Sequence, residues 1–113
     1  MMNLAAEDLP NGATKVRLDG RLDVVGAGQI ETRFSALAGA RRALIVDLSA
    51  VDFIASMGIR MLLLGANTVK ANHGRMVLLG AKPDVAAVLK TARIDAIVPM
   101  YDDLAAAATA VHG

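Results

Sequence analysis

The sequence predicts a single α/β domain built around a mixed β-sheet. A continuous apolar run, Ala43-Leu44-Ile45-Val46, has the length and composition of a strand that is covered on both faces. Helix-like and strand-like segments alternate on either side of it, and a hairpin signal precedes it. At 113 residues the chain supports one hydrophobic core, so residues 1–113 are expected to form one domain. With 55% hydrophobic but only 3% aromatic residues, that core should be aliphatic.

A β-hairpin is expected at the start of the chain. Residues 3–8 and 14–19 flank Pro10-Asn11-Gly12, which is a strong turn signal. Val16 and Leu18 alternate along the second arm and are therefore expected to face the core.

The other elements follow from apolar spacing and from helix start and stop signals. In chain order they are a helix over 25–37, the buried strand closed by Asp47, a short turn, a helix over 57–72, a strand over 75–79, a helix opened by Pro83-Asp84, a short strand over 97–101, and a helix over 104–111 capped by Asp102-Asp103.

Ser56 stands where the N-cap of the helix over 57–72 is expected. A serine hydroxyl at that position accepts a hydrogen bond from an otherwise unpaired amide in the first helical turn. His73-Gly74 provides the stop signal at the other end of the helix.

The helix over 57–72 has two apolar stripes on a helical wheel. The core stripe is expected to contain Ile59, Leu62, Leu63, Ala66, Val69 and the Lys70 stem, and the opposite stripe Met57, Met61, Leu64 and Thr68. So small a chain has few elements left to cover both stripes, which favours a partner surface, although methionine more often fills core gaps. Gly58 and Gly65 would permit close approach of the partner, and Arg60 would supply a polar rim contact. The same stripe would equally support a homodimer.

Two separated motifs in this chain resemble those of the anti-sigma factor antagonists of the STAS (sulfate transporter and anti-sigma factor antagonist) family. Leu18-Asp19-Gly20-Arg21-Leu22-Asp23 matches an early family element. Asp47-Leu48-Ser49 and Phe53-Ile54-Ala55-Ser56-Met57-Gly58-Ile59 match the strand end and helix start that follow. The resemblance covers most of the chain. It implies the STAS fold, a mixed central sheet of four to five strands with about four helices in a single layer mainly on one face.

The resemblance also implies a function. Ser56 falls on the family's phosphoacceptor position, where phosphorylation by an anti-sigma factor with serine kinase activity releases the antagonist and a serine phosphatase restores it. The family's preceding Asp is Ala55 here, and its following Ser or Thr is Met57. Two alternatives remain open: a constitutive STAS subunit of a membrane transport system in which Ser56 only caps the helix, and a small-ligand or nucleotide sensor using the loops around Asp23 and Ser56.

A phosphate on Ser56 would add about −1.5 to −2 charge beside the partner surface. The helix dipole tolerates that charge, so modification should change binding and leave the fold intact. Asp23 is expected either to cap the first helix or to border this surface. The expected partner-binding set is Asp23, Ser56, Met57, Gly58, Arg60, Met61 and Leu64.

Composition argues against several other functions. Twelve basic and eleven acidic residues give a formal net charge of +1, which provides no electrostatic footprint for nucleic acid. The chain lacks cysteine, a signal-peptide pattern and an apolar run of membrane-spanning length, so a cytoplasmic protein is expected. No metal, cofactor or catalytic constellation is predicted. The sites weighed were His73, His112, the Gly26-Ala27-Gly28 stretch and the Asp47 and Asp52 pair, and none has the companions such sites need.

Overall fold

The structure, a computed structural model, describes residues 1–112 and contains one five-stranded sheet whose spatial order, β1-β2-β3-β4-β5, is the order of the chain. Its strands are β1 (Asn3–Asp8), β2 (Thr14–Leu22), β3 (Ala43–Ile54), β4 (Arg75–Leu79) and β5 (Met100–Tyr101). β1 pairs antiparallel with β2, and every later pair is parallel. The predicted mixed sheet of four to five strands is thus confirmed.

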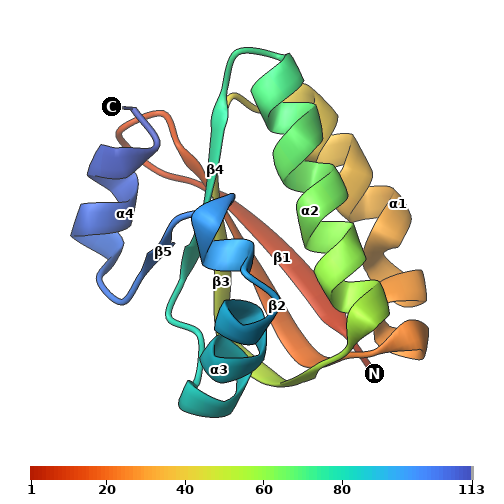
Figure 1. The fold of residues 1–113 in the computed structure, drawn as a ribbon. Helices are drawn as coiled ribbons and strands as arrows, with labels where there is room; N and C mark the ends of the chain where they lie inside the picture. Colours follow the sequence, from red (N-terminus) through yellow and green to blue (C-terminus); the bar gives the residue numbers. More distant parts are fainter. Residues whose placement is uncertain (113) are drawn as a thin grey trace.

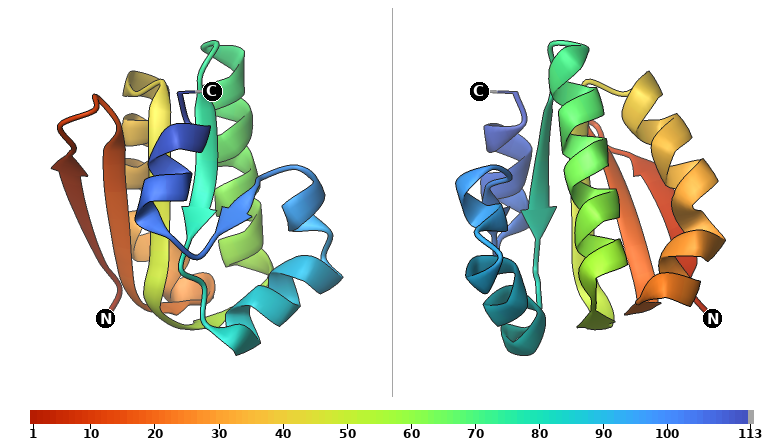
Figure 2. Two further views of the ribbon diagram at one scale, coloured as in Figure 1. Left: turned by 90° about the vertical axis from the view of Figure 1, so that its left-hand side faces the viewer. Right: turned by 45° about the vertical axis from the view of Figure 1, so that its right-hand side comes forward.

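Helices cover both faces of the sheet unequally (Figures 1 and 2). The helices are α1 (Val24–Ala40), α2 (Ser56–Ala71), α3 (Pro83–Thr91) and α4 (Leu104–Ala110), with a 3-10 turn, η1, at Ile94–Ala96. α1, α2 and α3 share the larger core on one face, whereas α4 packs on the other face. Consecutive residues of β3 divide between them, since Leu44 and Val46 join the larger core and Ile45 the smaller.

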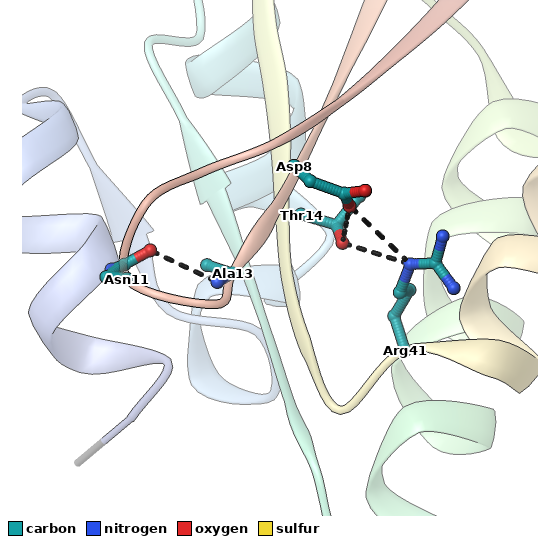
Figure 3. Close-up of polar contacts among 5 residues, drawn as sticks. All are labelled: Asp8, Asn11, Ala13, Thr14 and Arg41. Carbon is teal, nitrogen blue, oxygen red and sulfur yellow. Dashed lines mark hydrogen bonds and ion pairs between the residues drawn. The ribbon is translucent and has the colours of Figure 1, made fainter.

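The hairpin of β1 and β2 forms as predicted, and the two β2 residues expected to face the core are fully buried. A polar cluster links the turn end of this hairpin to the residue that follows α1 (Figure 3). The buried Thr14 hydroxyl donates to Asp8 Oδ1 at 3.0 Å and accepts from Arg41 Nε at 3.1 Å. Within the turn, Asn11 Oδ1 accepts from the Ala13 N–H at 3.1 Å.

β3 is longer than the sequence predicts. The expected turn after Asp47 is absent, and the strand continues to Ile54. The reason is that β2 supplies a pairing partner along this whole stretch, as far as Leu22 opposite Ile54. Two register shifts in the β2–β3 ladder absorb the irregular residues, and Asp47 Oδ1 accepts from the Ser49 N–H at 2.9 Å. The Asp-Leu-Ser motif therefore lies within a strand.

β5 is shorter than predicted, with Met100–Tyr101 in place of residues 97–101. The preceding residues cannot continue a ladder, because Pro99 has no N–H to donate. The N–H of Val98 already donates to the Ile94 carbonyl at 2.7 Å, within the turn made by η1.

Candidate partner-binding site

The start of α2 is fixed to the end of β2. The Ala55 N–H donates to the Leu22 carbonyl at 3.1 Å, and the Ala55 carbonyl accepts from the Ile59 N–H at 3.0 Å. Ala55 is therefore the N-cap of α2, and the exposed Ser56 is the first residue inside the helix. The prediction that Ser56 caps α2 is wrong by one position, because β3 runs to Ile54 and leaves only Ala55 between strand and helix.

Asp23 lies at the neighbouring helix start and fits both of its sequence interpretations. Its Oδ1 accepts from the Gly26 N–H at 2.8 Å and so caps α1, while Oδ2 lies 3.5 Å from Arg21 Nε. Asp23 also directly follows Leu22, to which the residue before Ser56 is bonded. The first turns of α1 and α2 thus lie side by side at the bottom of Figure 1. The Gly26 amide, and then Arg21, lower the pKa of the Asp23 carboxyl.

Two of the predicted partner-binding residues are buried. Met61 is only 5% exposed, and a Cβ added to the buried Gly58 would lie 2.5 Å from the Leu22 carbonyl oxygen. The buried positions of α2 follow a single stripe. They are Gly58, Met61, Leu62, Gly65 and Val69.

This stripe is rotated from the predicted one towards Gly58 and Gly65. A helical wheel scored by hydrophobicity gives glycine almost no weight, so it does not place these two residues on the buried side. The close approach that they permit is thus made within the chain, by β2 and α1, and not by a partner. Placing Met61 on the exposed stripe was wrong, and burial removes Met61 and Gly58 from direct contact with another protein.

The remaining α2 residues of the set do lie at the surface. Met57 is 42% exposed and Leu64 53% exposed, and they lie two helical turns apart on one face. Arg60 is exposed between them in the sequence. An exposed apolar face with a charged side chain beside it is suited to contact with another protein.

Three further apolar residues surround the start of α2, and the sequence interpretation missed them. Val24 and Val25 are largely exposed on the first turn of α1, and Phe53 is partly exposed near the end of β3. The guanidinium of Arg21 lies 4.3 Å from the centroid of the Phe53 ring, the geometry of a cation–π contact. A helical wheel places both valines outside the buried stripe that contains Ile30 and Phe34, and this position could have indicated from the sequence that they are exposed.

The charged residues near this end of the sheet are paired locally. Lys82, the N-cap residue of α3, bonds to Asp52 Oδ1 and lowers the pKa of that carboxyl. Arg21 pairs with Asp23. The exposed apolar residues are therefore bordered by charges of both signs.

The structure does not bring together the residues considered for metal binding or for an acid/base pair. Within residues 1–112, no group of three or more His, Cys, Asp and Glu side chains is placed to hold a metal ion. Asp47 is buried and bonded to the Ser49 amide, whereas Asp52 is exposed and paired with Lys82, so the two carboxylates do not form an acid/base pair. None of the helices described is both long and apolar enough to cross a membrane.

Comparison with known proteins identifies the family. The sequence profile of the STAS domain matches residues 6–107, which is nearly the whole chain. The chain belongs to the STAS domain family. Both the motif resemblance and the sheet with mainly one-sided helices agree with this assignment.

This STAS domain resembles anti-sigma factor antagonists in particular. One relative is BtrV of Bordetella bronchiseptica, which is described as a candidate anti-sigma factor antagonist. The two chains are 34% identical over 95 residues, and the match covers 82% of this chain and 81% of BtrV. The crystal structure of an anti-sigma factor antagonist from Mycobacterium paratuberculosis superposes with a TM-score of 0.89 at 26% identity, covering 100% of this chain and 96% of that one.

The fold is also that of SpoIIAA. The unphosphorylated form of this anti-sigma factor antagonist superposes with a TM-score of 0.71 at 24% identity, over 98% of this STAS domain and 99% of SpoIIAA. The phosphorylated form of SpoIIAA, from Bacillus, gives 0.72 at 23% identity, over 96% and 99% of the two chains.

Proposed function

We propose that this STAS domain is a cytoplasmic anti-sigma factor antagonist that acts by partner switching. Unphosphorylated, it binds an anti-sigma factor with serine kinase activity; phosphorylation of Ser56 releases it, and a serine phosphatase reverses the modification. The observation that carries the proposal is the exposed Ser56 on the first turn of α2, bordered by the exposed apolar side chains of Met57 and Phe53. Its relatives' roles and the two forms of SpoIIAA support it.

The local structure explains why a phosphate there would change binding. The first turn of α2 contains no acidic residue, so its unpaired amides and the helix dipole accommodate an anion at Ser56. The fold should therefore survive the modification. A partner that covers Met57 and Phe53 would instead have to desolvate about −1.5 to −2 charge next to the ionised Asp23.

The first experiment locates phosphate. The protein is incubated with ATP and the soluble extract of its host, and the modified residue is identified by intact-mass and peptide mass spectrometry. Ser56→Ala should abolish the modification, whereas Ser35→Ala, at an exposed serine of α1, should leave it unchanged. Phosphate on any other residue, or none under conditions that modify a known antagonist, contradicts the proposal.

The second experiment measures binding to the anti-sigma factor kinase, purified from the same extract by its activity on Ser56. Ser56→Asp should weaken the complex, Ser56→Ala should preserve it, and Met57→Asp should weaken it without loss of fold. The specific observation that favours a constitutive transport subunit is that the unmodified chain already exposes several apolar residues, Val24, Val25, Phe53 and Met57. That alternative predicts equal binding by Ser56→Asp and Ser56→Ala and loss of binding only with Met57→Asp.

A further inference from the structure

Within residues 1–112, no strand pairs with the first three residues of β4, Arg75–Val77, on the side that faces β5. β5 pairs with β4 only at Leu78 and Leu79, near the C-terminal end of β4 (Figure 2). The Leu78 N–H donates to the Pro99 carbonyl at 2.9 Å, so Leu78 points its backbone groups towards β5. Met76, two residues earlier, points its N–H and carbonyl to the same side. A ladder continued in this register needs an N–H at position 99, and that residue is proline.

A groove of about 320 Å³ lies over this edge. Its lining comes from both faces of the sheet, with Ala66 of α2 on one side and Ala110 of α4 on the other. Ile97 lines it as well and is 60% exposed, although it is a large aliphatic residue. Pro99 and Tyr101 continue this largely apolar lining. The groove thus reaches the edge of β4 between two helices, at Met76 and Val77, which are otherwise buried (5% and 1% exposed).

The charged residues of the groove are all cationic. Lys70, in the last turn of α2, and Arg75, at the start of β4, both line it, and the lining contains no Asp or Glu. The four ion pairs within residues 1–112 use other cations, so neither Lys70 nor Arg75 has a carboxylate partner in that part of the chain. Arg75 Nη1 donates to the Ala110 carbonyl at 3.3 Å, which leaves its other donors available.

We propose that this groove binds an extended, acidic peptide segment of a partner protein, which adds a short strand to the edge of β4 beside Arg75–Val77. An added strand would supply one backbone donor and one backbone acceptor to the Met76 carbonyl and N–H, which point to the side where β5 does not pair. Its aliphatic side chains would cover Ile97 and Tyr101, and its carboxylate would lie between Lys70 and Arg75. The open edge is about 10 Å long at 3.3 Å per residue, so only a short segment docks.

The groove is independent of the Ser56 site. α2 carries Ser56 in its first turn and Lys70 in its last, about 21 Å apart at 1.5 Å per residue. One partner segment can therefore occupy the groove while another surface covers the first turn of α2. Peptide binding at the groove does not depend on phosphorylation, so Ser56→Asp protein should bind the peptide as well as the unmodified chain does.

The test is a titration of ¹⁵N-labelled protein with the capped pentapeptide Glu-Val-Thr-Val-Glu, followed by NMR. Saturable shifts are expected at the Met76 and Ile97 amides, and the Met76 amide should exchange more slowly with solvent. The matched peptide with lysine in place of both glutamates should not bind.

Variants then test the charges and the apolar lining. Lys70→Glu with Arg75→Glu should weaken binding about tenfold, since attraction at two positions becomes repulsion. Ile97→Asp should also weaken it, whereas Arg33→Glu on the exposed surface of α1 should have no effect. Absence of shifts at millimolar peptide, shifts confined to the Ser56 end, equal binding of the lysine peptide, or unchanged affinity in the double variant would each overturn the proposal. Melting curves of the variants verify that they are folded.

Discussion

Gly65 of α2 faces the ring of Phe34 of α1 so closely that a Cβ at Gly65 would lie 2.5 Å from Cε2 of that ring. Gly58, two turns earlier, makes an equivalent approach to the Leu22 carbonyl. These contacts let α2 lie directly against α1 and against the end of β2. The position of Ser56 therefore depends on two residues that have no side chain.

Gly65→Ala should destabilise the protein by about 1–3 kcal/mol, because the added methyl group overpacks the contact with Phe34. Gly28→Ala provides the matched control: it lies in α1, and nothing lies within 4 Å of an added Cβ. That change should stabilise the protein by about 0.5–1 kcal/mol. Urea unfolding measures both free energies. Equal effects of the two substitutions would show that the α1–α2 contact is looser than described.

Met61→Asp and Met57→Asp should differ sharply although both replace a methionine of α2. Met61 is buried, so an unpaired carboxylate there should cost about 3 kcal/mol or more in unfolding free energy. Met57 is exposed in the first turn of α2, so a carboxylate there should not destabilise the protein and could stabilise it by up to about 1 kcal/mol. Thermal unfolding followed by circular dichroism distinguishes them. A folded, fully stable Met61→Asp protein would contradict the burial of that side chain.

Ser56→Asp should stabilise the isolated protein by about 0.3–1 kcal/mol at low ionic strength, because it places a carboxylate in a first turn that has none. Added salt should reduce the gain. Denaturant unfolding at two salt concentrations tests this, with Ser35→Asp in the middle of α1 as the control. A marked loss of stability would mean that any failure of Ser56→Asp to bind a partner reflects unfolding.

Acid should remove the stabilisation contributed by Asp23 and Asp52. Both have folded-state pKa values below their ordinary value of 3.8, so their contribution is complete well above that pH. It is lost as the pH falls below 3.8 and through the lowered folded values. Asp23→Asn keeps a good N-cap for α1 but cannot titrate, so the acid limb of its stability profile should be shallower. Unfolding measured across this pH range, with ¹³C carboxyl titration, tests it; an unchanged acid limb would contradict the shifted pKa.

Local patterns predicted most of the fold. Pro10-Asn11-Gly12 and the alternation of β2 identified the hairpin, and the helices and β4 begin and end close to their predicted residues. The length of β3 escaped prediction because it depends on pairing with β2, which no local pattern records. β5 was overestimated because Pro99 breaks a ladder that the apolar composition favours.

The candidate site was predicted less completely. The family motif located Ser56, and the helical wheel found Met57 and Leu64 as exposed apolar residues. The wheel misplaced Met61 because it gave no weight to the glycines on the buried side of α2. Phe53 lies on β3, which continues to Ile54 where a turn was predicted, and is 40% exposed.

The order of the strands in the sheet has a consequence for synthesis on the ribosome. Because every strand lies next to the one that precedes it in the chain, each newly emerged strand finds its pairing template already made. No strand has to insert between two others that have already paired. β5 and α4 emerge after β4, so the whole edge of β4 is unpaired in the nascent chain until β5 has been synthesised. In the folded protein, β5 pairs with Leu78 and Leu79 of this edge.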